Sequence, residues 1–177
     1  ALKQSGFSEK QITDVIAKVP PVPGRLEPVY GKDKVIYVDY AHKPDALEKV
    51  LSFLKPLCKG RLISVFGCGG DRDKGKRPVM GEISRRIADV TIVTSDNPRT
   101  ENPDEIIKQI VSGIEDKEHY PLLIEADRRK AIALAIETAS PSDIILIAGK
   151  GHEPYQEING IKYPFHDVIV AQEMLSQ

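Results

Sequence analysis

The 177-residue sequence lacks the features that mark several classes of protein. It contains only two cysteines, Cys58 and Cys68, and neither stands in a C-x-x-C pair or at a spacing typical of metal ligands. No apolar run approaches the length of a membrane span, and the first residues do not have the build of a signal peptide. The formal net charge is −1, so the positive field of a nucleic-acid-binding protein is missing. These absences predict a cytoplasmic protein that binds neither membrane nor nucleic acid.

What is present is the composition of a globular domain, with 41% apolar and 29% charged residues. Near the start, residues 7–19 carry apolar side chains at helical spacing behind Ser8, a good N-cap residue, and predict a helix. Three prolines within residues 20–23 end it and hold the chain extended. Because a lone helix cannot bury its apolar stripe and the chain has no initiator Met, we expect residues 1–22 to belong to a further domain.

Strands and helices alternate through the rest of the chain. Apolar runs predict strands at residues 35–38, 62–66, 90–94, 122–124 and 144–148, and helical spacing predicts helices at 44–55, 78–88, 103–114 and 128–139. This alternation is typical of a parallel sheet covered on both faces, so the sequence predicts an α/β, Rossmann-like, doubly wound fold with a mostly parallel sheet. A C-terminal hairpin at 155–163, turning on Asn159-Gly160, and a closing helix at 167–175 complete the prediction.

Glycines and charges follow four of the five predicted strands, in residues 39–44, 67–77, 95–99 and 149–153. Ordinary connecting loops also contain such residues, so one loop alone indicates little. In a parallel sheet, however, all the carboxyl ends lie on one rim, which is where ligands bind. Arginines, carboxylates and an amide on one rim suit a zwitterion, because an amino acid offers a carboxylate to Arg and an ammonium group to Asp or Glu.

Two nucleotide-binding motifs are incomplete. The run Gly70–Lys76 has P-loop spacing, but Arg77 stands where the motif needs Ser or Thr, and Asp71 and Asp73 would repel a triphosphate. The run Gly67–Arg72 lacks the third glycine of a dinucleotide fingerprint. The four histidines show no metal-ligand spacing. The sequence therefore predicts that this chain has no complete binding site for a triphosphate, a dinucleotide or a metal ion.

Five motifs, in order along the chain, resemble those of the Mur ligase family. They are Val22–Glu27, Asp39–Leu47, Gly69–Pro78, Asp96–Arg99 and Gly149–Glu153. The likeness covers essentially the whole chain. The Asp-Asn-Pro-Arg run at 96–99 is similar to the signature of the members that add meso-diaminopimelate.

The resemblance implies that residues 23–177 form the C-terminal, amino-acid-binding domain and that residues 1–22 are the last helix of a central ATP-binding domain. The implied reaction is an ATP-driven amide ligation. A carboxylate of UDP-N-acetylmuramoyl-L-alanyl-D-glutamate (the UDP-MurNAc-dipeptide) takes the γ-phosphate, and the amine of meso-diaminopimelate then displaces phosphate. ATP and Mg²⁺ would be bound mainly by the central domain. We therefore expect no metal ligand and no assigned catalytic residue in this chain, and no activity from it alone.

The resemblance also implies a role for individual residues. Arg99 and Arg72 would clamp the second carboxylate of diaminopimelate, which lysine lacks, and two desolvated, unpaired guanidinium groups would then disfavour lysine. The residues implied to bind diaminopimelate are Arg72, Asp96, Asn97, Arg99, Gly149 and Glu153. Those implied to meet the nucleotide are Arg25, Asp39 and His42.

Three other interpretations remain open at this point. A Rossmann-like module could bind an amino acid without any chemistry. A nicotinamide-dependent oxidoreductase would share the fold, although the glycine fingerprint is missing. A folate polyglutamate ligase would share the superfamily, although Asp96–Arg99 speaks against it.

Overall fold

The computed structural model describes residues 5–16, 18–20, 22–31, 33–116 and 118–176. Eight strands occur within them: β1 (Glu27–Tyr30), β2 (Val35–Asp39), β3 (Leu62–Phe66), β4 (Val90–Val93), β5 (Leu122–Ile124), β6 (Ile144–Ala148), β7 (Tyr155–Ile158) and β8 (Ile161–Pro164). The helices are α1 (Glu9–Ile16), α2 (Pro44–Leu54), η2 (Lys55–Leu57), α3 (Lys76–Ile87), α4 (Pro103–Val111), α5 (Arg128–Thr138) and α6 (Asp167–Leu175).

The main sheet has six strands in the order β1-β2-β6-β3-β4-β5. All neighbouring pairs are parallel except β1–β2, which is antiparallel. The predicted α/β, mostly parallel sheet with a C-terminal hairpin is therefore confirmed. The hairpin β7–β8 forms a separate sheet, and its turn residues Asn159 and Gly160 have φ angles of 50° and 75°, as a type I′ turn requires.

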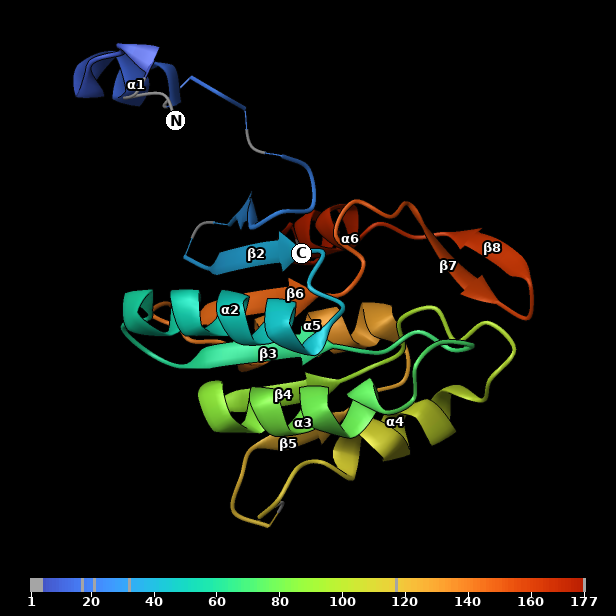
Figure 1. Cartoon of the computed structure of the whole chain (residues 1–177). Helices are drawn as coiled ribbons and strands as arrows, with labels where there is room; N and C mark the ends of the chain where they lie inside the picture. Colours follow the sequence, from blue (N-terminus) through green and yellow to red (C-terminus); the bar gives the residue numbers. More distant parts are fainter. Residues whose placement is uncertain (1–4, 17, 21, 32, 117, 177) are drawn as a thin grey trace.

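Helices cover both faces of the main sheet (Figure 1). Strand β6 shows why its residues are apolar throughout: Ile144, Leu146 and Ala148 pack toward α2, α3 and α4, whereas Ile145 and Ile147 pack toward α5 and α6. A central strand buried on both sides needs an unbroken apolar run rather than alternation. This packing fixes the carboxyl ends of β2, β6, β3 and β4 side by side on one edge of the sheet.

Sequence reasoning missed the strand β1 and the short helix η2. Only Val29 of the four residues of β1 is a buried apolar side chain, and Pro28 interrupts the pattern. Proline is tolerated here because β1 is an edge strand. The predicted helix at 78–88 begins earlier, at Lys76, and the helix predicted at 103–114 ends at Val111.

The first helix, α1, lies apart from the sheet in Figure 1. Phe7 and Val15 are 51% and 62% exposed, and Val19, three residues beyond the helix, is 59% exposed. The predicted stripe includes Ile16, whose side chain lies outside the described set, as do residues 1–4, 17 and 21 of the predicted segment 1–22. The apolar side of α1 therefore has little cover in this chain.

Candidate functional site

A pocket of about 790 Å³ opens at the carboxyl ends of the parallel strands. The loops after β2, β3, β4 and β6 all contribute to it, and Tyr155 of β7 closes one side. This placement agrees with the rim that the sequence predicts. The residues that line it include Tyr40, His42, Lys43, Asp45, Arg72, Asp73, Lys76, Asp96, Asn97, Arg99, Gly149, Glu153 and Tyr155.

The structure brings most of the predicted site residues together. All six residues expected to bind diaminopimelate line the pocket, and so does His42 of the nucleotide group. Arg25 and Asp39 do not line it. Arg25 stacks over the ring of Tyr40, with its guanidinium carbon 4.7 Å from the ring centre, just outside the pocket.

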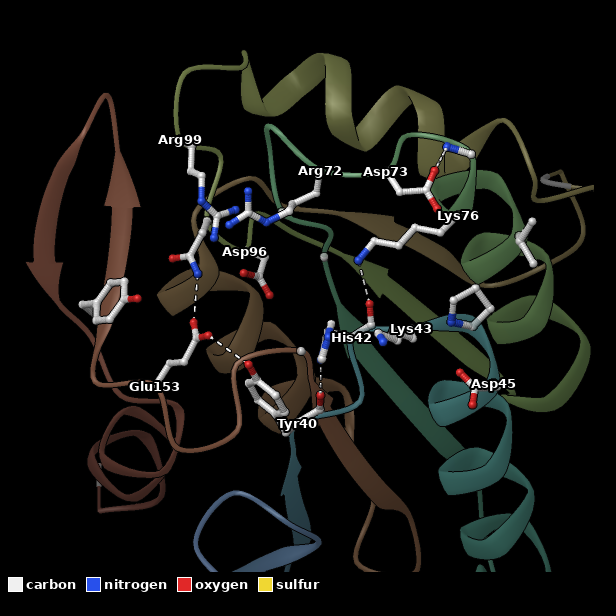
Figure 2. A pocket seen from close by; sticks show the side chains of 18 residues that line it. Tyr40, His42, Lys43, Asp45, Arg72, Asp73, Lys76, Asp96, Arg99 and Glu153 are labelled. Atoms are coloured by element: carbon white, nitrogen blue, oxygen red, sulfur yellow. Dashed lines mark hydrogen bonds between the residues drawn. The ribbon is translucent and has the colours of Figure 1, made fainter.

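Two guanidinium groups meet at one end of the pocket. Figure 2 shows Arg99, from the loop after β4, and Arg72, from the loop after β3, pointing toward one another. Arg99 Nη1 donates to the carbonyl of Gly70 (2.9 Å), and Arg99 Nε lies 3.3 Å from Glu157 Oε2. Arg72 is exposed and donates only to the carbonyl of Asp71 among the described residues. Adjacent like charges are unfavourable unless an anion lies between them, so this end suits a carboxylate.

Acidic groups lie across the pocket from the arginines. Glu153 Oε2 accepts from Asn97 Nδ2 (2.9 Å), and Tyr40 Oη lies 3.5 Å from Glu153 Oε1 (Figure 2). Burial, followed by the charge of Glu153, raises the pKa of Tyr40, so its hydroxyl stays protonated and able to donate. Asp96 is only 7% exposed and also faces the pocket. Two carboxylates on this side suit an ammonium group.

Gly149 and Asp96 approach each other too closely for any larger residue. Gly149 has a φ of 119°, and a Cβ atom there would lie 2.6 Å from Asp96 Oδ2. Glycine is therefore needed at this strand end both for its backbone conformation and for the space beside the carboxylate. Gly149 is buried, and its amide donates to the carbonyl of Asp39 (3.0 Å), which ties the end of β6 to the end of β2.

A buried lysine beneath the pocket is a feature that sequence reasoning missed. Lys150 is 0% exposed, and its ammonium group donates to Asn97 Oδ1 (3.1 Å) and Glu153 Oε2 (3.4 Å). Burial lowers the pKa of Lys150, while Asp96 opposes that effect. Because Asn97 Oδ1 also accepts from the amide of Glu157 (2.9 Å), the Asn97 side chain is locked with its NH₂ toward Glu153.

A buried ion pair braces two of the strand ends. Arg128, at the start of α5, makes two hydrogen bonds of 2.8 Å to Asp167, at the start of α6, and both residues are fully buried. The same guanidinium donates to the carbonyls of Ser95 (3.4 Å) and Ala148 (3.1 Å). These carbonyls directly precede the predicted ligand residues Asp96 and Gly149. Neither Arg128 nor Asp167 carries a motif that could have marked it in the sequence.

The opposite end of the pocket has a different character. His42, Lys43, Asp45 and Lys76 lie there (Figure 2), and Lys76 Nζ donates to the carbonyl of His42 (2.7 Å). The nearby Asp39 accepts from the backbone amides of Leu26 and Ala41, each at 2.8 Å. Asp39 therefore holds the segment after Arg25 against the end of β2, rather than offering a free carboxylate.

The described residues contain no group of three or more His, Cys, Asp or Glu side chains that could hold a metal ion. Within the same residues, no helix has the length and apolar character needed to cross a membrane. Cys68 is buried, and burial raises the pKa of its thiol to about 12, so it acts as a small packing residue.

Comparison with known proteins assigns the family. The model of the family described as "Mur ligase, glutamate ligase domain" matches residues 24–151, which are most of the chain. The chain belongs to the Mur ligase family. The likeness predicted from the five motifs is confirmed.

Two proteins similar to this Mur ligase domain carry the same name. A UDP-N-acetylmuramoyl-L-alanyl-D-glutamate–2,6-diaminopimelate ligase of Aquifex aeolicus is 53% identical over 154 residues, which are 87% of this chain and 32% of the relative. A solved structure of a ligase of the same name superposes with a TM-score of 0.83 at 43% identity, covering 98% of this chain and 36% of that one. This chain thus spans about a third of the length of each of these two ligases.

A folylpolyglutamate synthase of Thermotoga maritima also superposes, with a TM-score of 0.58 at 22% identity, over 84% of this chain and 32% of that one. At that identity the likeness shows a shared fold alone. The identity to the diaminopimelate ligase of Aquifex aeolicus is much higher, at 53%.

Proposed function

We propose that this Mur ligase domain is the amino-acid-binding part of an ATP-dependent ligase that joins meso-diaminopimelate to UDP-N-acetylmuramoyl-L-alanyl-D-glutamate, a step in peptidoglycan synthesis. The observation that carries the proposal is the charge pattern of the pocket. Arg72 and Arg99 converge at one end, and Asp96 and Glu153 lie across from them. The far end of diaminopimelate has one carboxylate and one ammonium group, which match these two sides.

In this arrangement the second carboxylate of diaminopimelate lies between the two guanidinium groups. Its ammonium group lies against Glu153, the carboxylate of Asp96 and the backbone of Gly149. Asn97 acts less by direct contact than by holding Glu153, since its oxygen is already bonded to Lys150 and Glu157. Lysine has no second carboxylate to place between the two guanidinium groups, so their mutual repulsion would remain, which disfavours lysine.

The sequence predicts that ATP and Mg²⁺ are bound mainly outside this chain. The described part has no cluster of metal-ligating side chains, and the sequence has no complete P-loop. We therefore assign both groups mainly to the rest of the ligase, where they would supply the energy of ligation and neutralise phosphate charge. From this chain, Arg25 and His42 would meet the nucleotide, and Asp39 would hold their loop in place.

The proposed domain boundary lies between residues 22 and 23. Residues 23–177 would form the amino-acid-binding domain, and residues 1–22 the last helix of the preceding ATP-binding domain. The exposed apolar side chains of α1 support this division, because such a stripe is normally covered by a neighbouring domain.

The proposal is tested by assaying release of phosphate with ATP, the UDP-linked dipeptide and meso-diaminopimelate. A full-length ligase carrying this sequence should add diaminopimelate, and the 177-residue chain alone should show no turnover under the same conditions. Turnover by the chain alone would contradict the division of labour. A full-length protein that adds lysine as readily as diaminopimelate would contradict the substrate assignment.

A further inference from the structure

Hydrogen bonds join the hairpin β7–β8 and its turn to three of the four residues of the signature loop 96–99. Gln156 Nε2 donates to the carbonyl of Asp96 (2.7 Å), and the amide of Glu157 donates to Asn97 Oδ1 (2.9 Å). The Arg99 amide donates to the carbonyl of Glu157 (3.0 Å), and the amide of Asn159 donates to the carbonyl of Arg99 (2.7 Å). These bonds hold Arg99 at a φ of 51°, a conformation that non-glycine residues rarely adopt.

The Glu157 side chain adds a contact of a different kind. Its carboxylate lies 3.3 Å from Arg99 Nε, and the two side chains are 24% and 19% exposed. On the other side, Nη1 is held by the carbonyl of Gly70. Arg99 Nη2 makes no hydrogen bond to any described part of the chain. The guanidinium is thus gripped at two positions and presents its remaining edge toward Arg72 and the pocket (Figure 2).

This grip opposes a repulsion that is visible in the structure. Arg72 and Arg99 carry like charges side by side, and Arg72 has no carboxylate partner among the described residues. Without an anion nearby, Arg99 would gain by turning toward solvent. Glu157 supplies that anion from the far edge of the guanidinium, where it leaves the inner edge free for a ligand.

We propose that Glu157 is a positioning residue that holds Arg99 beside Arg72 before the substrate arrives, and that it thereby sets the preference for an amino acid with a second carboxylate. The inference rests on the proposed function, because it takes diaminopimelate as the substrate. It also makes the hairpin part of the recognition site, although only Tyr155 of the hairpin lines the pocket. Two opposite effects of Glu157 can be separated: orientation of Arg99 favours diaminopimelate, whereas direct repulsion of the substrate carboxylate would disfavour it.

The test is Glu157→Gln in the full-length ligase, with kcat/KM measured for meso-diaminopimelate and for lysine. Glutamine keeps the shape and every backbone bond of the hairpin but removes the charge. We expect the ratio of the two kcat/KM values to fall about tenfold, through a higher KM for diaminopimelate. The KM for ATP should stay at its wild-type value, and the kcat/KM for lysine should not fall, because lysine has no second carboxylate for Arg99 to hold.

Tyr163→Ser is the matched control. Tyr163 lies opposite Gln156 on β8 and is 48% exposed, so its loss perturbs the same hairpin without touching Arg99. The control should keep the wild-type ratio. An unchanged or increased ratio in Glu157→Gln would overturn the inference, and so would an equal loss for both amino acids. If the unsubstituted enzyme does not add diaminopimelate at all, the proposed function itself fails, which is a separate outcome.

Discussion

The two ends of the pocket differ in how far the protein has already satisfied their polar groups. At the end proposed to bind diaminopimelate (the diaminopimelate end), the Asn97 side chain has three hydrogen-bond partners, and the pair Arg128–Asp167 holds the strand ends behind it. At the end proposed to meet the nucleotide (the nucleotide end), His42 Nδ1 contacts the carbonyl of Tyr40 (2.9 Å), and Arg25 stacks on the Tyr40 ring. The first end is organised before any ligand binds. The second offers exposed groups that need a partner surface, which agrees with a domain that works as part of a larger ligase.

The largest effect should come from the brace behind the diaminopimelate end. Replacing Arg128 with Met leaves the buried carboxylate of Asp167 without a partner, which costs about 3–5 kcal/mol in the free energy of unfolding. Urea denaturation of the chain measures this value. Arg129→Met is the matched control, because Arg129 pairs with Glu173 across the same two helices at 48% and 47% exposure, and such pairs contribute about 0–1 kcal/mol. If both variants lose the same unfolding free energy, the buried pair stabilises the fold no more than the exposed pair does.

The next effect should fall on the substrate itself. Arg99→Lys keeps the positive charge but loses the planar fork, so we expect kcat/KM for diaminopimelate in the full-length ligase to fall about a hundredfold. The preference over lysine should fall with it, while the KM for ATP stays unchanged. Arg85→Lys, at a partly exposed position on α3, should change neither the kcat/KM for diaminopimelate, nor the preference over lysine, nor the KM for ATP. If Arg99→Lys keeps the wild-type preference for diaminopimelate over lysine, Arg99 does not bind the second carboxylate as proposed.

The smallest effect concerns acid stability near the loop that carries Arg72. Hydrogen bonds from the buried Arg77, more than any other contact, lower the pKa of Glu101 to about 2 from an ordinary value of 4.5. Because the folded state holds this carboxylate ionised, its contribution to stability is full above about pH 4.5 and is lost as the pH falls toward 2.

Replacing Glu101 with Gln should therefore flatten the fall in unfolding free energy between those two pH values. Urea denaturation at a series of pH values checks this. Glu105→Gln removes an exposed carboxylate whose partner is Lys108, and it should keep the wild-type slope. The same slope in Glu101→Gln as in the parent would show that the Arg77–Glu101 contact does not govern acid stability.

Sequence reasoning predicted the strands and the residues of the pocket, but it missed the buried contacts that hold those residues in place. The strands β3 and β6 are continuous apolar runs, and the predicted bounds of both agree with the structure. The six residues that the motifs predict to bind diaminopimelate all line one pocket. Lys150 was missed because a lysine between glycines suggests a solvent-exposed loop, and only the fold buries it beneath Glu153. Glu157 was missed because its partner Arg99 is 58 residues earlier, and no local pattern pairs them.

The most direct measurement is a crystal structure of this chain, or of the full-length ligase, with meso-diaminopimelate bound. The account predicts that the second carboxylate lies between Arg72 and Arg99 and that its neighbouring ammonium group lies against Glu153. It also predicts that Arg99 keeps its contact with Glu157. A ligand bound at the His42 end, or an Arg99 side chain turned away from Arg72 in the complex, would contradict the account.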